Sequence, residues 1–147
     1  MPSWAEDTRR FLDAHRLGHV ATVGSDGMPH VMPVCYALDD EAIYFVADAK
    51  PKRRPARALK RLVNLRANPR AALVVDDWDE DWTRLAWVLV RGPAAIVEDR
   101  GLHAAALVRL RGRYPQYRAM SLGDPVAHPI VRIAPLSVTA WRASETR

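Results

Sequence analysis

Residues 17–34, LGHVATVGSDGMPHVMPV, contain the pattern that decides the fold of this 147-residue chain. A short run rich in β-branched residues at 19–23 is followed by Ser25-Asp26-Gly27. Asp-Gly is a strong hairpin signal, because both residues accept the backbone angles of a tight turn. A second apolar run begins near His30 and continues to Leu38. The segment therefore predicts an antiparallel β-hairpin.

Four more short strands are predicted after this hairpin, at residues 42–47, 71–75, 85–97 and 130–141, which makes six in all. Pro33 has no backbone N–H and indicates an edge strand or a bulge, while Gly92-Pro93 predicts a bulge or bend. Helices are predicted before residue 18, between residues 55 and 69, and from residue 99 towards residue 114. Because strands cluster with short turns, the pattern favours a mostly β, α+β fold: one antiparallel barrel with helices laid on it, a single domain over residues 1–147.

The segment at residues 50–70, KPKRRPARALKRLVNLRANPR, concentrates positive charge. It holds nine Lys or Arg residues and no acid, in a chain whose net charge is +5. At 3.6 residues per turn a polar face separates from an apolar one. The polar face contains Arg57, Lys60, Arg61 and Asn64, and the apolar face contains Leu59, Leu62 and Val63. A basic helix face suits an anionic ligand, although solvated surface charge explains the composition equally well.

Composition and missing motifs exclude several classes. No run approaches the roughly 18 to 20 apolar residues of a membrane span, and the N-terminus lacks the apolar core of a secretory signal, so we expect a cytoplasmic protein without a membrane partner. The lone cysteine, Cys35, excludes an internal disulfide and a Cys-based zinc site, and the histidines lack metal-binding spacing, so no metal is expected. Phosphate-binding glycine motifs and a nucleophile elbow are missing from the sequence. Catalytic residues therefore stay unassigned, and a bound cofactor is expected to carry any reaction.

An acidic cluster directly after the basic segment speaks against nucleic acid as a partner. Residues 76–81, DDWDED, would repel phosphates wherever they lie near the path of a nucleic acid. Nucleic-acid binding is therefore a minority hypothesis. It would be supported if the protein bound a DNA duplex with an affinity that fell steeply as the salt concentration rose.

The order of these features resembles the pyridoxamine 5′-phosphate oxidase-like split β-barrel superfamily of flavin and deazaflavin proteins. The resemblance is carried by the hairpin at residues 17–34, by NLRANPRAALVV at residues 64–75 with basic residues upstream, and by a strand that ends in Gly92. Residues 76–92, DDWDEDWTRLAWVLVRG, are similar to the corresponding segment of one branch of this superfamily, which is thought to use coenzyme F420. Trp82 resembles a residue that is typical of this branch. The resemblance implies a six-stranded split β-barrel.

The resemblance also implies a homodimer with the cofactor at its interface. It assigns Lys60 and Arg61 to the cofactor phosphate, and we expect Arg57 and Lys52 to help hold an acidic tail of the cofactor. The residues that it places around the ring system are Met32, Pro33, Val34, Ala47, Asp48 and Trp87, the last reaching across the dimer interface. The implied activity is a hydride transfer between the deazaflavin and an apolar, conjugated small molecule.

The choice of cofactor depends on the number of anionic groups to be neutralised. The loop at residues 50–55 carries four cations, more than the single phosphate of FMN requires, whereas F420 offers a phosphodiester and a polyglutamate tail. This favours F420. The alternatives are an FMN-dependent oxidase or reductase, and a non-catalytic protein that carries a flavin, deazaflavin or haem. No match to the oxidase's C-terminal substrate-binding residues is found, which disfavours pyridoxamine phosphate as the substrate.

Overall fold

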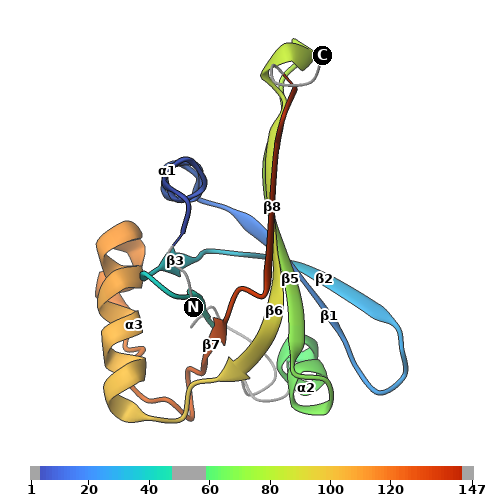
Figure 1. Cartoon of the computed structure of the whole chain (residues 1–147). Helices are drawn as coiled ribbons and strands as arrows, with labels where there is room; N and C mark the ends of the chain where they lie inside the picture. The colour runs from blue at the N-terminus through green and yellow to red at the C-terminus, as the bar shows by residue number, and fades with distance from the viewer. Residues whose placement is uncertain (1–3, 48–58, 144–147) are drawn as a thin grey trace.

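The computed structural model describes residues 4–47 and 59–143, which form one curled antiparallel sheet with helices packed against it (Figure 1). The described strands are β1 (Gly18–Val23), β2 (Pro29–Val34), β3 (Ala37–Leu38), β4 (Ile43–Val46), β5 (Arg70–Asp77), β6 (Ala86–Ile96), β7 (Ile130–Ile133) and β8 (Ser137–Arg142). The helices are α1 (Glu6–Ala14), α2 (Lys60–Ala67) and α3 (Arg100–Arg113), with two short 3₁₀ helices, η2 (Trp82–Arg84) and η3 (Pro115–Ala119). The sheet order is β2-β1-β5-β6-β7-β4-β3, and β8 pairs with β6.

The predicted α+β class and antiparallel sheet are confirmed, but the count of six strands is wrong. The single strand expected at residues 30–38 is divided into β2 and β3, because the backbone N–H and C=O of Tyr36 bond the Tyr114 hydroxyl, at 2.9 and 2.8 Å, instead of a neighbouring strand. The strand expected at 130–141 is divided into β7 and β8 around Pro135, which has no N–H to donate. The described residues therefore form eight strands.

The bulge predicted at Gly92-Pro93 is also wrong, because β6 runs without a break from Ala86 to Ile96. Its first part pairs with β8 and its last part with β7, and the linker between these two strands crosses β6 beside Gly92. A Cβ atom at Gly92 would lie 1.9 Å from the carbonyl oxygen of Ala134. Glycine is required here for close approach of two backbones.

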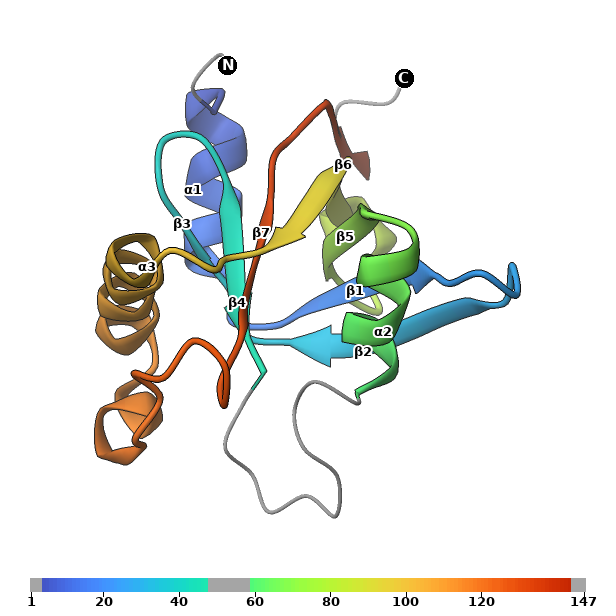
Figure 2. The ribbon, with the colours of Figure 1, turned by 90° about the horizontal axis from the view of Figure 1, so that it is seen from below.

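Two clusters of buried side chains hold the helices to the sheet. The first lies inside the curl and includes Leu12 of α1, Leu62 of α2 and Leu73 of β5, all fully buried. The second joins α3 to β4 and β7 through Leu110 and Ile130. Figure 2 shows the result: α2 lies near β1 and β2, and α3 lies beyond β3 and β4.

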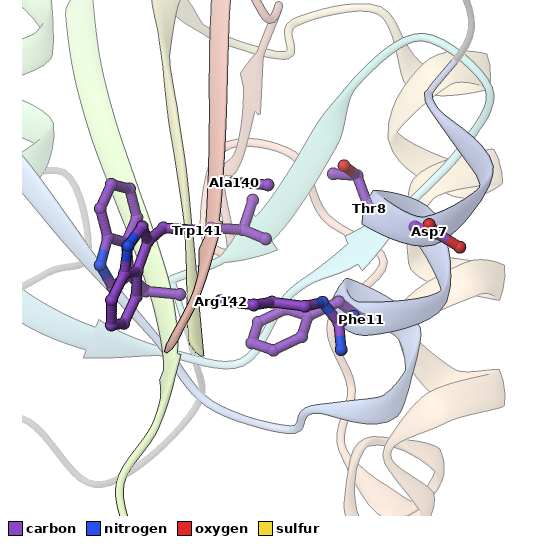
Figure 3. A pocket seen from close by; sticks show the side chains of 8 residues that line it. Asp7, Thr8, Phe11, Ala140, Trp141 and Arg142 are labelled. Carbon is purple, nitrogen blue, oxygen red and sulfur yellow. The ribbon is translucent and has the colours of Figure 1, made fainter. Parts of the chain in front are cut away.

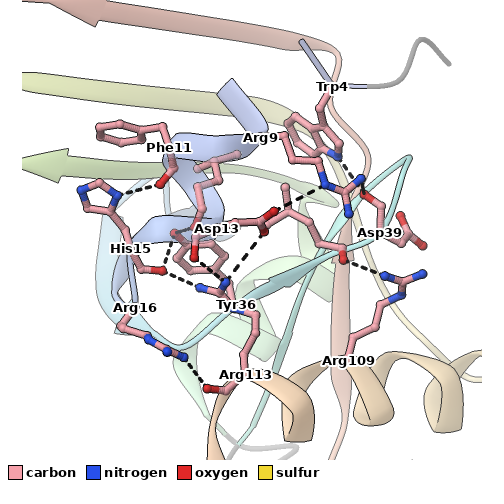
Figure 4. Close-up of polar contacts among 12 residues, drawn as sticks. Trp4, Arg9, Phe11, Asp13, His15, Arg16, Tyr36, Asp39, Arg109 and Arg113 are labelled. Carbon is pink, nitrogen blue, oxygen red and sulfur yellow. Dashed lines mark hydrogen bonds and ion pairs between the residues drawn. The ribbon is translucent and has the colours of Figure 1, made fainter. Parts of the chain in front are cut away.

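Arg113 joins the end of α3 to the segment between α1 and β1 (Figure 4). Its guanidinium donates to the carbonyl oxygens of Asp13, Tyr36 and His15, and lies 5.1 Å from the centroid of the Tyr36 ring. Burial raises the pKa of Tyr36 well above its ordinary value, although the Arg113 charge opposes this, so the hydroxyl stays protonated and donates to Leu12 O at 2.6 Å. These contacts fix the β2–β3 break.

Asp39 organises the turn between β3 and β4. Its carboxylate accepts from the amides of Glu41 and Ala42, both at 2.8 Å, and from the Tyr44 hydroxyl at 2.7 Å. Burial acts to raise the pKa of Asp39, but these hydrogen bonds and the charge of Arg109 outweigh it, so the pKa is lowered. The ionised carboxylate therefore stabilises the fold above its ordinary pKa of 3.8, and this contribution is lost as the pH falls through the lowered folded-state value.

Asp39→Asn is expected to reduce the free energy of unfolding by about 1 to 2 kcal/mol at neutral pH, since charged hydrogen bonds are replaced by neutral ones. The difference from the wild type should shrink as the pH falls below the ordinary value of 3.8. Urea unfolding across this pH range measures both effects. Asp40→Asn is the matched control: its carboxylate is 85% exposed and pairs with Arg9, so about 0.5 kcal/mol or less is expected. A difference at Asp39 that did not depend on pH would contradict this account.

No helix within the described ranges is long and apolar enough to cross a bilayer.

Candidate functional site

The strand register separates the half-barrel into an inner and an outer face. Residues directly opposite each other on paired strands point to the same side, and successive residues alternate. The inner face carries Val20, Thr22, Met32, Val34, Leu73 and Val88. The outer face carries Ala21, Pro33, Ala72, Trp87, Arg91 and Trp141. The inner face contains the core and α2, and the outer face is covered by no described helix.

The first turn of α2 presents two cations on the inner side of β1. Lys60 is exposed, whereas Arg61 is 7% exposed and Asn64 is fully buried. The Asn64 amide donates to the Thr22 hydroxyl at 3.1 Å, which ties the helix to β1. The N-cap residue, Leu59, supplies no side-chain acceptor for the first N–H groups of the helix. Two cations beside an uncapped helix N-terminus fit a phosphate group.

Gly24 creates the space in which this turn sits. A Cβ atom there would lie 2.3 Å from Asn64 Oδ1 and 3.4 Å from Lys60 Nζ. Lys60 Nζ is also 3.9 Å from the Asp26 carboxylate in the β1–β2 turn. Asn64 Oδ1 is buried and accepts no hydrogen bond within the described residues. The Lys60 ammonium therefore has a carboxylate and an amide oxygen in its neighbourhood.

The structure brings only part of the predicted cofactor set together. Met32 and Val34 share the inner face with Lys60 and Arg61. Pro33 and Trp87 point to the outer face, so within one chain they cannot contact a ligand held on the inner face. Ala47 is fully buried after β4, where its N–H donates to Pro129 O at 2.9 Å. Lys52, Arg57 and Asp48 lie outside the described residues, and the roles of all these residues stay predictions.

Sequence reasoning did not find Trp141, although it lies opposite Trp87 across the β6–β8 pair. The two indole rings are stacked, with centroids 6.2 Å apart and planes inclined by 22°. The signal is a tryptophan on each of two long strands, but their pairing follows only from the path of β7 and β8. The pair forms a half-buried aromatic platform on the outer face.

A small cavity lies behind this platform, between α1 and strands β6 and β8. Figure 3 shows Arg142 beside Phe11 of α1, and Trp141 on the other side of β8. The Arg142 guanidinium lies 5.8 Å from the Phe11 ring centroid. At about 130 Å³ this cavity is too small for a ring cofactor, since ligand pockets usually measure roughly 300 to 1,000 Å³.

Comparison with known proteins identifies the family. Residues 5–142 match the family model described as pyridoxamine 5′-phosphate oxidase. The chain belongs to the pyridoxamine 5′-phosphate oxidase family. Members of this family are oxidoreductases.

Three known proteins are similar to this chain in sequence or in structure. A 5a,11a-dehydrotetracycline/5a,11a-dehydrooxytetracycline reductase from Streptomyces rimosus is 34% identical over 67 residues, which are 46% of this chain and 44% of that protein. The alignment thus spans less than half of the relative. The conserved hypothetical protein Rv2991 from Mycobacterium tuberculosis superimposes with a TM-score of 0.74 and 28% identity, over 95% of this chain and 86% of that one. An F420 reductase superimposes with a TM-score of 0.67 and 27% identity, over 92% of this chain and 98% of that one.

Proposed function

We propose that this protein is an F420-dependent reductase that transfers a hydride from the deazaflavin to an apolar, conjugated small molecule. The observation that carries the proposal is the cation pair, Lys60 and Arg61, at an uncapped helix N-terminus on the same face as Met32 and Val34. Similarity to an F420 reductase and to a 5a,11a-dehydrotetracycline/5a,11a-dehydrooxytetracycline reductase supports it. FMN remains the alternative cofactor, because a phosphate at the same turn would suit either molecule.

We also propose that the working unit is a homodimer in which one chain completes the site of the other. Trp87 points away from the face that carries Lys60 and Arg61, so a ring held by both sets of residues must lie between two chains. The outer face offers apolar side chains for such an interface, including Val31 at 58% exposed and the half-buried pair of Trp87 and Trp141. Hydrophobic residues exposed together on one sheet face mark an interaction surface.

The residues of the chain would bind and orient the reactants rather than take part in covalent chemistry. Lys60 and Arg61 would hold the cofactor phosphate, with Arg57 and Lys52 near the acidic tail. Met32 and Val34 from one chain, and Pro33 and Trp87 from its partner, would fix the ring and exclude water from it. Bound F420 in its reduced form would supply the hydride and become oxidised, and the accompanying proton would come from water. Orientation is the protein's main contribution to rate.

Side-by-side titration of the purified protein with F420 and FMN tests the choice of cofactor. F420 is expected to bind at least about tenfold more tightly, since its extra anionic groups meet extra cations. The bound forms are distinguished by the cofactors' own absorbance, near ~420 nm for F420 and ~450 nm for FMN. Tighter binding of FMN would favour the FMN-dependent alternative. Tight binding without turnover of any acceptor would favour a carrier protein, and binding of neither cofactor would contradict the proposal.

A further inference from the structure

A groove of about 610 Å³ lies on the outer face, where β1, β5, β6 and β8 run next to one another (Figure 1). Its floor is formed by Ala21 and Ala72, which are directly opposite each other across the β1–β5 pair. Two small side chains at adjacent positions leave a depression that larger residues would fill. Pro93 and the 81%-exposed Leu136 form an apolar wall. The groove has the size and the mainly apolar lining of a small-molecule site.

Two arginines lie at the rim of this groove. Arg70 is opposite Pro93 and Ala72 is opposite Arg91, so Arg70 and Arg91 are diagonal neighbours on the same face. Such neighbours have Cα atoms about 7 to 8 Å apart, within reach of a single carboxylate or sulfonate for side chains of this length. Both arginines are exposed, and no hydrogen bond or ion pair within the described ranges involves either guanidinium.

The groove contains no acid that would neutralise this pair, since its described lining includes neither Asp nor Glu. Two exposed arginines elsewhere on the chain do have acidic partners: Arg10 pairs with Glu6 at 3.0 Å and Arg84 with Asp81 at 3.7 Å. Two like charges placed together on a sheet face destabilise the fold slightly. Arg70 and Arg91, which have no acidic partner and lie above an apolar floor, therefore suit a ligand that combines an anionic group with an apolar body.

We propose that this groove binds an aromatic or polycyclic compound that carries an anionic oxygen group, held by Arg70 and Arg91 over the alanine floor. The site is separate from the cation pair of α2, which lies on the inner face. Guanidinium groups suit this ligand because they form paired, charge-assisted hydrogen bonds to oxyanions. Binding in the groove does not depend on the cofactor. Only the assignment of this ligand class to the substrate rests on the proposed function.

The test uses two probes of similar shape, 8-anilinonaphthalene-1-sulfonate and its uncharged counterpart N-phenyl-1-naphthylamine, added to the purified full chain without cofactor. The sulfonate is expected to bind saturably, with one site per chain. Arg70→Gln with Arg91→Gln should weaken its binding about 10- to 100-fold and change binding of the neutral probe less than about threefold, because only charge-assisted bonds are lost. Arg70→Lys with Arg91→Lys should restore part of the affinity.

Matched variants separate a local effect from a general one. Arg10→Gln with Arg84→Gln removes the same charge from other surfaces and should leave sulfonate binding unchanged. Ala72→Leu fills the floor and should abolish binding of both probes, and thermal unfolding shows that each variant is folded. Unchanged sulfonate affinity in the Arg70/Arg91 variant would overturn the proposal, as would displacement of the probe by one equivalent of F420 or FMN. If the protein binds F420 or FMN but not the sulfonate probe, only the proposal of the groove is rejected. If it binds the sulfonate probe but neither cofactor, only the proposed function is rejected.

Discussion

Replacing Lys60 and Arg61 together by alanine is expected to weaken F420 binding by about 2 to 4 kcal/mol, which corresponds to roughly 30- to 1,000-fold in Kd. Each charge-assisted hydrogen bond to a phosphate contributes about 1.5 to 3 kcal/mol, and the two cations act on one group, so their effects are not fully additive. Lys60 is exposed, so most of its loss should appear as affinity rather than as stability. Isothermal titration or cofactor absorbance provides the measurement.

Arg61 requires a second variant because it is 7% exposed and its removal also affects packing. Arg61→Gln keeps most of the length and polarity while it removes the charge. Arg66→Ala, at the other end of the same helix, is the matched control and should leave the affinity within about threefold of the wild type. If a folded Lys60→Ala/Arg61→Gln variant bound F420 with the affinity of the wild type, α2 would not be part of the cofactor site.

A mixed dimer extends this experiment to the proposed sharing of the site. A chain that lacks both cations and a chain with Trp87→Ala should each bind F420 poorly. When they are mixed, each heterodimer contains one site with both cations from one chain and Trp87 from the other. Affinity should therefore return at one of the two sites of each heterodimer, which is about a quarter of all sites after statistical exchange between equal amounts of the two chains. If subunit exchange is verified and mixing restores no affinity, the cations and Trp87 do not form one site shared between two chains.

The sequence predicted those features that depend on short-range periodicity. The hairpin formed as expected, with Gly27 in the left-handed region at φ 73°, and α2 ends at Ala67, with Asn68 as its C-cap before Pro69. Periodicity also placed Arg61 and Asn64 on one face of this helix. It did not reveal that this face turns towards β1, so Asn64 is fully buried while Val63, predicted to be on the apolar face, is 44% exposed.

Features that depend on distant contacts were missed for a common reason. The division between β2 and β3 is caused by Tyr114, far along the chain, and the continuity of β6 depends on where β7 gives way to β8. The same topology brings Trp141 to Trp87 and places Arg91 diagonally to Arg70. No local pattern contains these pairings. The sequence could therefore predict an anion site in the basic stretch, which stays a prediction, whereas the outer-face groove and the tryptophan pair required the structure.

Gly92→Ala is expected to reduce the free energy of unfolding by about 3 kcal/mol or more, at the upper end of the range for overpacked sites. The added Cβ would lie 1.9 Å from Ala134 O and 2.9 Å from Leu136 N, both backbone atoms. No side-chain rotation relieves contacts with a backbone, so β6 or the β7–β8 linker must move. That movement strains the hydrogen bonds from Ala134 N to Pro93 O and from Leu136 N to Arg91 O, both at 2.9 Å.

Gly112→Ala is the matched control for the same chemical change. Gly112 lies in α3, where an added methyl group would meet no atom within 4 Å, and alanine is favoured over glycine in a helix by about 0.5 to 1 kcal/mol. The two substitutions should therefore shift the urea midpoint in opposite directions. A Gly92→Ala variant within about 0.5 kcal/mol of the wild type would contradict the crossing of β6 by the linker. Because β8 carries Trp141 and Ser137 borders the groove, the same variant should also disturb the outer face, which binding of the neutral naphthylamine probe would detect.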